Sequence, residues 1–144
     1  MIEYCLAERK HLVQILDLYR QLNPEDEPFN GNLDKIWDKI IDMDIKYFIA
    51  MDDGKLVSTC YLVIIPNLSR KGRSIGFIEN VVTDIEYRRK GIGKKVMTRA
   101  MAYAKELNCY KVILQSGSKR KEAHNFYESL GFDGDSKRAF EKRL

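Results

Sequence analysis

The spacing of hydrophobic and polar residues divides the chain into segments typical of helices and of strands. Apolar residues recur at helical spacing over residues 7–22, 33–41, the stretch from the loop at 91 to about 107, and 121–130. Alternating or continuous apolar runs predict strands over residues 2–6, 47–51, 55–65, 75–83 and 111–115, with final short strands between Phe132 and Phe140. The turn Asp52-Asp53-Gly54 predicts an antiparallel hairpin. This order predicts a mixed sheet with helices on its faces.

Composition narrows the class of protein. A length of 144 residues without repeats or linkers predicts a single domain over residues 1–144. No apolar run approaches the ~20 residues of a membrane span, and the first residues lack a signal-peptide pattern. Cys5, Cys60 and Cys109 form no CxxC pair, and His11 is far from His124. We therefore expect a cytoplasmic protein with reduced thiols, no metal and no membrane partner.

A basic loop with two glycines, residues 88–95 (RRKGIGKK), carries the most distinctive chemistry. It lies between the strand that ends at Thr83 and a helix. Glycine lets the backbone approach an anion closely, and the start of a helix offers free N–H groups and a positive dipole end. A net charge of +4 is mild, so a specific anionic ligand explains the cluster at least as well as general nucleic-acid affinity. Charge alone leaves a solvated basic turn equally open.

Three known phosphate-binding loops can be compared with this stretch. A Walker A loop, GxxxxGK[ST], is not in the chain. A dinucleotide GxGxxG needs glycine where Val96 stands, and it normally follows the first strand of a fold. The third pattern, [Arg/Gln]-x-x-Gly-x-[Gly/Ala], is matched in full by Arg88 to Gly93.

With this match the chain resembles the GNAT superfamily of acyl-CoA-dependent N-acetyltransferases. Residues 78–83 (IENVVT) resemble the family's central strand, and residues 123–132 resemble its signature A-x-x-F-Y-x-x-x-G-F. The N-terminal half matches only in the order of elements. The resemblance implies an α+β (mixed α/β) fold. Its mixed, mostly antiparallel sheet is splayed between strands 4 and 5 and flanked by about four helices.

Within the superfamily, residues 78–81 and 109–114 are similar to glucosamine-6-phosphate N-acetyltransferases. Those enzymes usually carry an acidic residue just after the fifth strand, where this chain has Gln115 and Ser116.

The resemblance also implies a set of acetyl-CoA-binding residues. Backbone N–H groups of the loop would bind the pyrophosphate, with charged side chains adding contacts, over Arg88, Arg89, Lys90, Gly91, Ile92, Gly93, Lys94 and Lys95. The pantetheine arm would pair with Val81, Val82 and Thr83, and the helix signature would add Phe126 and Tyr127. The alternatives are a simple loop-to-helix transition for the glycines, a solvated helix face for Lys95, and core packing for the valine side chains.

Two residues are implied in catalysis. Tyr127 matches the family's tyrosine near the CoA sulfur, a general acid for the departing thiolate, and a buried core tyrosine is the alternative. Glu79, a carboxylate in an otherwise apolar strand, would accept the amine proton, bind substrate or form a structural ion pair. An N–H of Val81 or Val82 would polarise the thioester carbonyl. His124 fits contact with cofactor or solvent better than catalysis.

The function that follows is acetyl transfer from acetyl-CoA to a primary amine of a small molecule or peptide. A non-catalytic acyl-CoA-binding module of the same fold is the alternative. Binding of nucleic acid is not expected, since no aromatic residues interleave the basic clusters 88–95 and 118–121. The acidic loop Glu25-Asp26-Glu27 is more typical of a solvated surface than of an amine site. The sequence identifies neither the acceptor nor the oligomeric state, although homodimers are common among relatives.

Overall fold

The computed structural model describes residues 1–144, which divide into two compact units, Met1–Ile113 and Leu114–Leu144. Five strands form one sheet in the order β1 (Ile2–Leu6), β2 (Ile45–Asp52), β3 (Lys55–Ile65), β4 (Ile75–Thr83) and β5 (Lys111–Leu114). The pairs from β1 to β4 are antiparallel, whereas β5 runs parallel to β4. The predicted mixed, mostly antiparallel sheet is confirmed. That the chain forms a single domain stays a prediction.

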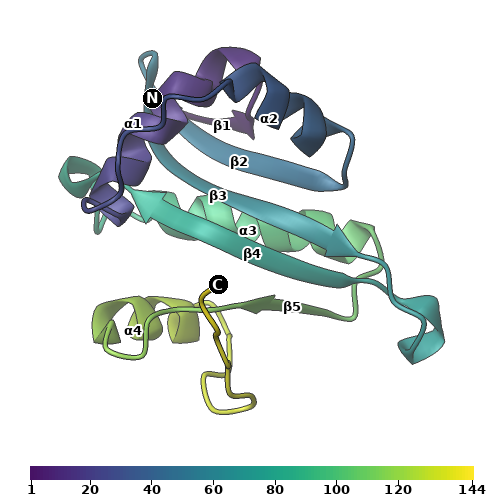
Figure 1. The fold of residues 1–144 in the computed structure, drawn as a ribbon. Helices are drawn as coiled ribbons and strands as arrows, with labels where there is room; N and C mark the ends of the chain where they lie inside the picture. Colours follow the sequence, from purple (N-terminus) through teal and green to yellow (C-terminus); the bar gives the residue numbers. More distant parts are fainter. The chain divides into compact units, whose positions relative to one another are not determined.

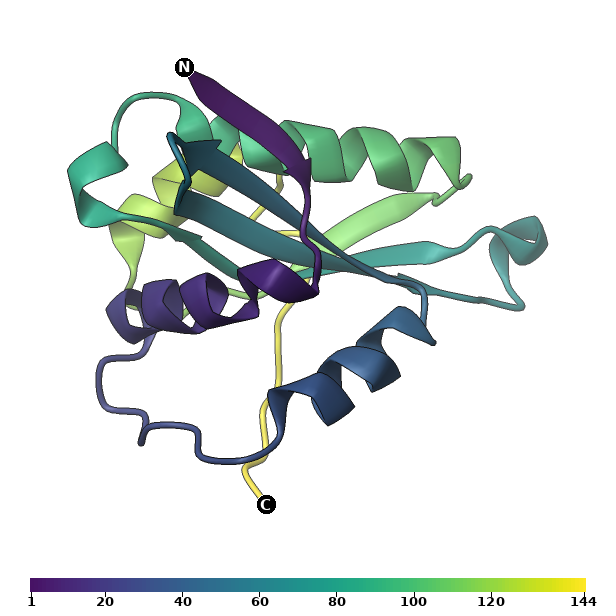
Figure 2. The ribbon, with the colours of Figure 1, turned by 90° about the horizontal axis from the view of Figure 1, so that it is seen from above.

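Four α-helices accompany the sheet, as expected. In the larger unit α1 (Leu12–Leu22), preceded by a 3-10 turn at Arg9–His11, and α2 (Leu33–Ile41) lie on one face of the sheet. The third helix, α3 (Ile92–Glu106), covers the opposite face (Figures 1 and 2). The fourth, α4 (Lys121–Ser129), belongs to the smaller unit. None of these helices is long and apolar enough to cross a membrane.

Each face of the sheet buries the apolar side of a helix, as the helical spacing predicts. On one face α1 packs onto the strands through a cluster formed by Ile15, Leu18, Ile49, Leu56 and Val82. On the other face α3 buries the stripe Val96, Met97, Ala100 and Ala104. Gly76 relieves crowding beneath α3, because a Cβ there would lie 3.2 Å from side-chain atoms of Leu62 and Val112 and 3.4 Å from the Ala104 Cβ. Packing of α1 on one face of the sheet and of α3 on the other holds the end of β4 and the start of α3 in position.

The smaller unit confirms one prediction and corrects another. Gly131, with φ of 92°, follows α4 as its C-terminal cap, and the Phe132 N–H donates to the Tyr127 carbonyl at 3.1 Å. No strand follows, so the expected short strands between Phe132 and Phe140 are wrong. The intervening DGDSKR run has no alternating apolar residues. Asp133 also accepts locally from the Asp135 N–H at 2.9 Å, which competes with strand pairing.

A β-bulge interrupts β4 near its centre. Glu79 pairs with Tyr61 of β3, but Val82 pairs with Thr59, so three steps along β4 oppose two along β3. Asn80 absorbs the extra residue with a left-handed φ of 50°, a conformation that asparagine tolerates better than most residues. Bulges bend the strand that carries them. Strands β4 and β5 begin together, where the Tyr110 N–H donates to the Ser74 carbonyl at 3.0 Å, and they separate toward their carboxyl ends (Figure 1).

Candidate functional site

The connection from β4 to α3 leaves an open helix start. A short 3-10 turn, Ile85–Tyr87, leads into the loop, and Gly91 takes the N-cap position of α3 with φ of 77° and ψ of 4°. Having no side chain, Gly91 cannot cap the first turn. The N–H groups of Ile92, Gly93 and Lys94 therefore lie where a helix has no internal acceptor. An anion can accept these hydrogen bonds and also meets the positive end of the helix dipole.

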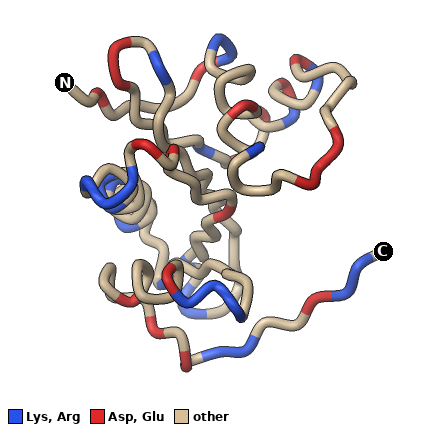
Figure 3. Tube along the Cα trace, turned by 90° about the vertical axis from the view of Figure 1, so that its left-hand side faces the viewer, with Lys and Arg blue, Asp and Glu red and all other residues tan.

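Basic residues are concentrated along the chain at this end of α3, which faces the viewer in Figure 3. Several are already engaged. The Arg88 Nε donates to the Thr83 carbonyl at 3.0 Å, and the Lys90 ammonium lies 5.2 Å from the centre of the Tyr87 ring. Lys95, by contrast, points to β1, where its ammonium lies 4.7 Å from the centre of the Tyr4 ring. We conclude that Lys95 contributes less to an anion site than Arg88 or Lys94.

The loop is braced against the β2–β3 hairpin. Asp84, which is buried, accepts from the Glu86 N–H at 2.9 Å and pairs with the Lys55 ammonium at 3.0 Å. Burial raises the pKa of Asp84, but the Glu86 N–H and Lys55 lower it, and the net pKa lies below its ordinary value. The Tyr87 hydroxyl adds a hydrogen bond to the Asp52 carboxylate at 2.9 Å. These contacts fix the direction in which the chain enters α3.

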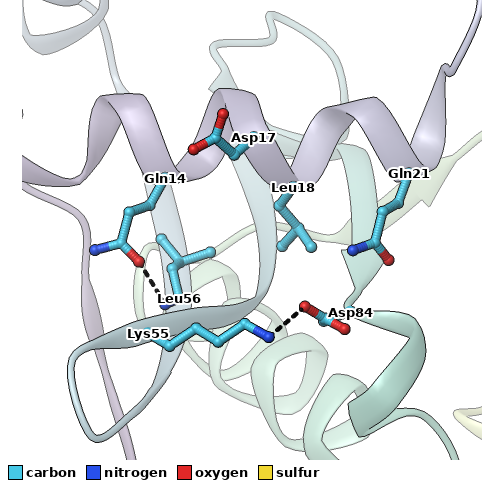
Figure 4. A pocket seen from close by; sticks show the side chains of 7 residues that line it. All are labelled: Gln14, Asp17, Leu18, Gln21, Lys55, Leu56 and Asp84. Carbon is cyan, nitrogen blue, oxygen red and sulfur yellow. Dashed lines mark hydrogen bonds and ion pairs between the residues drawn. The ribbon is translucent and has the colours of Figure 1, made fainter.

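A shallow hollow of about 180 Å³ accompanies this brace (Figure 4) and is lined by Gln14, Asp17, Leu18, Gln21, Lys55, Leu56 and Asp84. Its polar groups have protein partners. The Gln14 Oε1 accepts from the Leu56 N–H at 2.7 Å, and the Gln21 Oε1 accepts from the Ile85 N–H at 2.9 Å. Because the lining is already satisfied, we interpret the hollow as part of the brace and not as a ligand site.

The three residues that the resemblance assigns to the pantetheine arm, Val81, Val82 and Thr83, form the end of β4. Val82 is buried in the core against α1, and its carbonyl accepts from the Ser58 hydroxyl at 3.2 Å. The Thr83 hydroxyl shares a hydrogen bond of 2.8 Å with Ser58. Val81 is only half-buried and falls in the bulge, without a direct partner on β3. The core alternative therefore holds for the Val82 side chain and not for Val81.

Glu79 is a half-buried carboxylate without a protein partner. It makes no hydrogen bond and no salt bridge, so the structural ion pair that the sequence left open is excluded. Burial raises its pKa above the ordinary value. A carboxylate that burial makes more basic, and that no cation neutralises, is a stronger proton acceptor than an exposed glutamate.

Sequence reasoning missed the residues around Glu79. Tyr61 of β3 lies directly opposite Glu79, and Tyr47 of β2 lies directly opposite Tyr61. Asn80, which forms the bulge, was also missed. Only Asn80 leaves a local signal, an asparagine inside a strand. The tyrosines meet through strand register, which the local pattern does not reveal.

The signature residues of α4 make contacts with other residues of the smaller unit. Tyr127 is buried and contacts Phe126 and Phe132 edge-on, with ring centres 5.3 and 6.2 Å apart. The His124 Nε2 lies 2.8 Å from the Gly117 carbonyl, so the ring is engaged locally. That His124 is not the base stays a prediction, as does the catalytic role of Tyr127.

Comparison with known proteins finds acetyltransferases in both sequence and structure. Residues 12–132 match the model of the acetyltransferase (GNAT) family. Glucosamine 6-phosphate N-acetyltransferase of Trypanosoma brucei brucei is 38% identical over 99 residues, which are 69% of this chain and 62% of that protein. The enzyme of that name from Arabidopsis thaliana is 33% identical over 111 residues, 77% of this chain and 72% of its own length. A putative acetyltransferase structure from Agrobacterium tumefaciens str. C58 superposes with a TM-score of 0.92 at 36% identity, covering 99% of both chains. The match thus spans less than two thirds of the trypanosomal protein.

Proposed function

Because the chain belongs to the acetyltransferase (GNAT) family, we propose that it transfers the acetyl group of acetyl-CoA to a primary amine. One observation carries this proposal: the strand that leads into the open, basic start of α3 also bears an unpaired, half-buried carboxylate, Glu79. An anion site and a base on one strand suit a reaction between a polyphosphate-bearing thioester and an amine.

The first part of the proposal concerns acetyl-CoA. The N–H groups from Arg89 to Lys94 donate to the pyrophosphate, and Arg88 and Lys94 add charge. Beyond the bulge, the backbone of residues 81–83 pairs with the pantetheine arm where β4 parts from β5. The family signature assigns Phe126 to the same cofactor. No metal takes part.

The second part concerns the chemistry. Glu79 accepts a proton from the bound ammonium, directly or through a water molecule, and so leaves a neutral amine that can attack; its raised pKa makes it a better base than an exposed glutamate. The N–H of Val81 or Val82 polarises the thioester carbonyl. The neutral amine forms a C–N bond to the acetyl carbon as the C–S bond breaks, and Tyr127 donates a proton to the departing thiolate. The excess proton on the new amide nitrogen then returns, directly or through water, to the Tyr127 phenolate. The role of Tyr127 rests on its place in the family signature.

The relatives favour glucosamine 6-phosphate as the first acceptor to test, because two proteins of 38% and 33% identity carry that name. Small amines and peptide N-termini form the rest of a sensible panel. A homodimer of this chain is testable by light scattering of the intact protein.

The proposal is tested by following thiol release from acetyl-CoA across this amine panel. We expect thiol release that depends on one or more amines and that Glu79→Gln strongly reduces. Calorimetric binding of acetyl-CoA without turnover on any amine would favour a non-catalytic acyl-CoA-binding module. Absence of binding at millimolar acetyl-CoA would overturn the proposal altogether.

A further inference from the structure

Three side chains from neighbouring strands form a row on the α1 face of the sheet: Tyr47, Tyr61 and Glu79. Each is the direct Cα partner of the next, and Tyr47 packs beside the α1 core cluster. Directly paired residues on antiparallel strands point to the same face. The two tyrosine rings lie 5.0 Å apart between centres with a tilt of 36°. We call these three residues the aromatic row.

Helices bring two further aromatic side chains to the aromatic row. Trp37 of α2 meets Tyr47 edge-on, with ring centres 5.9 Å apart. Tyr19 of α1 belongs to the same cluster, and its hydroxyl oxygen is fully buried. Tyr47 and Asn80 approach the Tyr19 hydroxyl and shift its pKa through side-chain hydrogen bonding, although neither contact has good hydrogen-bond geometry. A buried hydroxyl whose hydrogen bonds are poorly formed costs free energy, which a better-placed partner would recover.

No cationic side chain shifts the pKa values of the aromatic row. The pKa of Tyr61 is raised by burial and then by Glu79, and that of Tyr47 is raised to about 12 by burial and Tyr61. No Lys, Arg or His contributes to either shift, nor to that of Glu79. The tyrosines are thus neutral at physiological pH, while Glu79 lacks a counter-ion. The aromatic rings of Trp37, Tyr47 and Tyr61, the poorly hydrogen-bonded hydroxyl of Tyr19 and the unpaired carboxylate of Glu79 are together complementary to a cation.

We infer that the aromatic row, together with Tyr19, is the subsite for the protonated amine of the acceptor, and that it selects amines with no negative charge on the adjoining carbon. The ring faces of Tyr47 and Tyr61 attract the ammonium. Glu79 adds a charge-assisted contact and then accepts the proton. A carboxylate next to the amine would instead face Glu79, whose like charge repels it. Tyr19 supplies a hydrogen bond to the acceptor.

This inference deepens the proposed function and rests on it for the proton transfer, but binding at the aromatic row can be measured without turnover. Norvalinamide and norvaline make a matched pair of probes, because they differ by neutralisation of the carboxylate beside the amine. The intact, CoA-saturated protein with ring-labelled tyrosines is titrated with each probe by NMR. We expect saturable shifts of the Tyr47 and Tyr61 rings with norvalinamide, and about tenfold weaker binding of norvaline. Equal affinities, or shifts confined to other tyrosines, would overturn the inference.

Variants separate ligand binding from structural support. Tyr19→Phe removes a buried hydroxyl whose contacts with Tyr47 and Asn80 are poorly formed hydrogen bonds, so we expect little change in Tm together with about tenfold weaker norvalinamide binding. Tyr103→Phe, on the α3 face where the ring meets Phe48, is the matched control and should change neither probe's affinity. Glu79→Gln should remove the preference for norvalinamide over norvaline. Unchanged norvalinamide affinity in Tyr19→Phe would contradict the role of that hydroxyl.

The two proposals fail in distinguishable ways. Norvalinamide that binds at the aromatic row, combined with no acetylation of any amine in the thiol-release screen, would leave the subsite standing and remove the proposed function. Acetylation of amines that never perturb the Tyr47 or Tyr61 rings would remove the subsite and leave the function standing.

Discussion

Replacing Gly91 by alanine isolates the backbone geometry on which the proposed pyrophosphate site depends. Gly91 has φ of 77° and ψ of 4°, and a Cβ built on it would meet no atom within 4 Å. The substitution therefore introduces backbone strain and no steric clash. Holding an L-residue in the left-handed region costs about 1–2 kcal/mol. We expect Gly91→Ala to lose about this much free energy of unfolding.

The chain supplies its own control in Gly54, at the turn of the β2–β3 hairpin. Its φ is 84°, and a Cβ there also meets nothing within 4 Å. Gly54→Ala should therefore lose a similar free energy of unfolding. With the usual unfolding entropy per residue, the Tm of a chain of 144 residues should fall by about 3–7 °C in both variants. Thermal and urea unfolding measure this loss.

The two variants should differ in acetyl-CoA affinity. At Gly91 the strain is relieved by turning the start of α3, which redirects the N–H groups of Ile92 and Gly93. We expect calorimetric titration to show acetyl-CoA binding weakened at least about tenfold in Gly91→Ala, equivalent to one well-formed charge-assisted hydrogen bond, and unchanged in Gly54→Ala. Gly91→Asn should fall between, since asparagine tolerates this conformation. Equal stability losses with unchanged affinity in Gly91→Ala would refute the reasoning.

Further predictions concern the proposed reaction and the brace. Burial raises the pKa of Glu79, so kcat/KM should fall with decreasing pH through a midpoint above the ordinary glutamate value, and Glu79→Gln should lack this limb in a pH–rate profile. Tyr127→Phe should lower kcat at least about tenfold while calorimetry finds acetyl-CoA affinity unchanged, and an equal loss of both would argue for a packing role. Asp84 has a lowered pKa, so its stabilisation is present above the unfolded pKa and lost as pH falls through the folded one. In urea unfolding Asp84→Asn should cost about 1 kcal/mol at neutral pH, with the difference from wild type shrinking on acidification.

Strong local patterns made much of the fold predictable. The bounds of α2 and β3 agree with expectation because helical spacing and a turn at Asp53-Gly54 are encoded over a few neighbouring residues. The start of α3 was predictable for the same reason, since Gly91 and the basic residues around it stand next to one another in the chain. The segment after Gly131 lacked any such pattern, and the strands expected there are absent.

Features that depend on register between strands were not predictable. The aromatic row requires that Tyr47, Tyr61 and Glu79 become neighbours across three strands, and one residue of slip would turn the side chains to the other face. The bulge at Asn80 is part of this register. The contact between Lys95 and Tyr4 likewise joins residues that are remote in sequence, so the sequence could not decide between a ligand contact and a solvated face.

The central claim is most directly tested by following a labelled acetyl group from acetyl-CoA to an amine. The wild-type protein is incubated with ¹³C-acetyl-CoA and the amine that releases most thiol, and free CoA and N-acetylated amine are quantified by mass spectrometry. We predict equal amounts of CoA and labelled N-acetyl product, with both strongly reduced in Glu79→Gln. Labelled acetate in place of the N-acetyl product, or no product at saturating acetyl-CoA, would contradict the account.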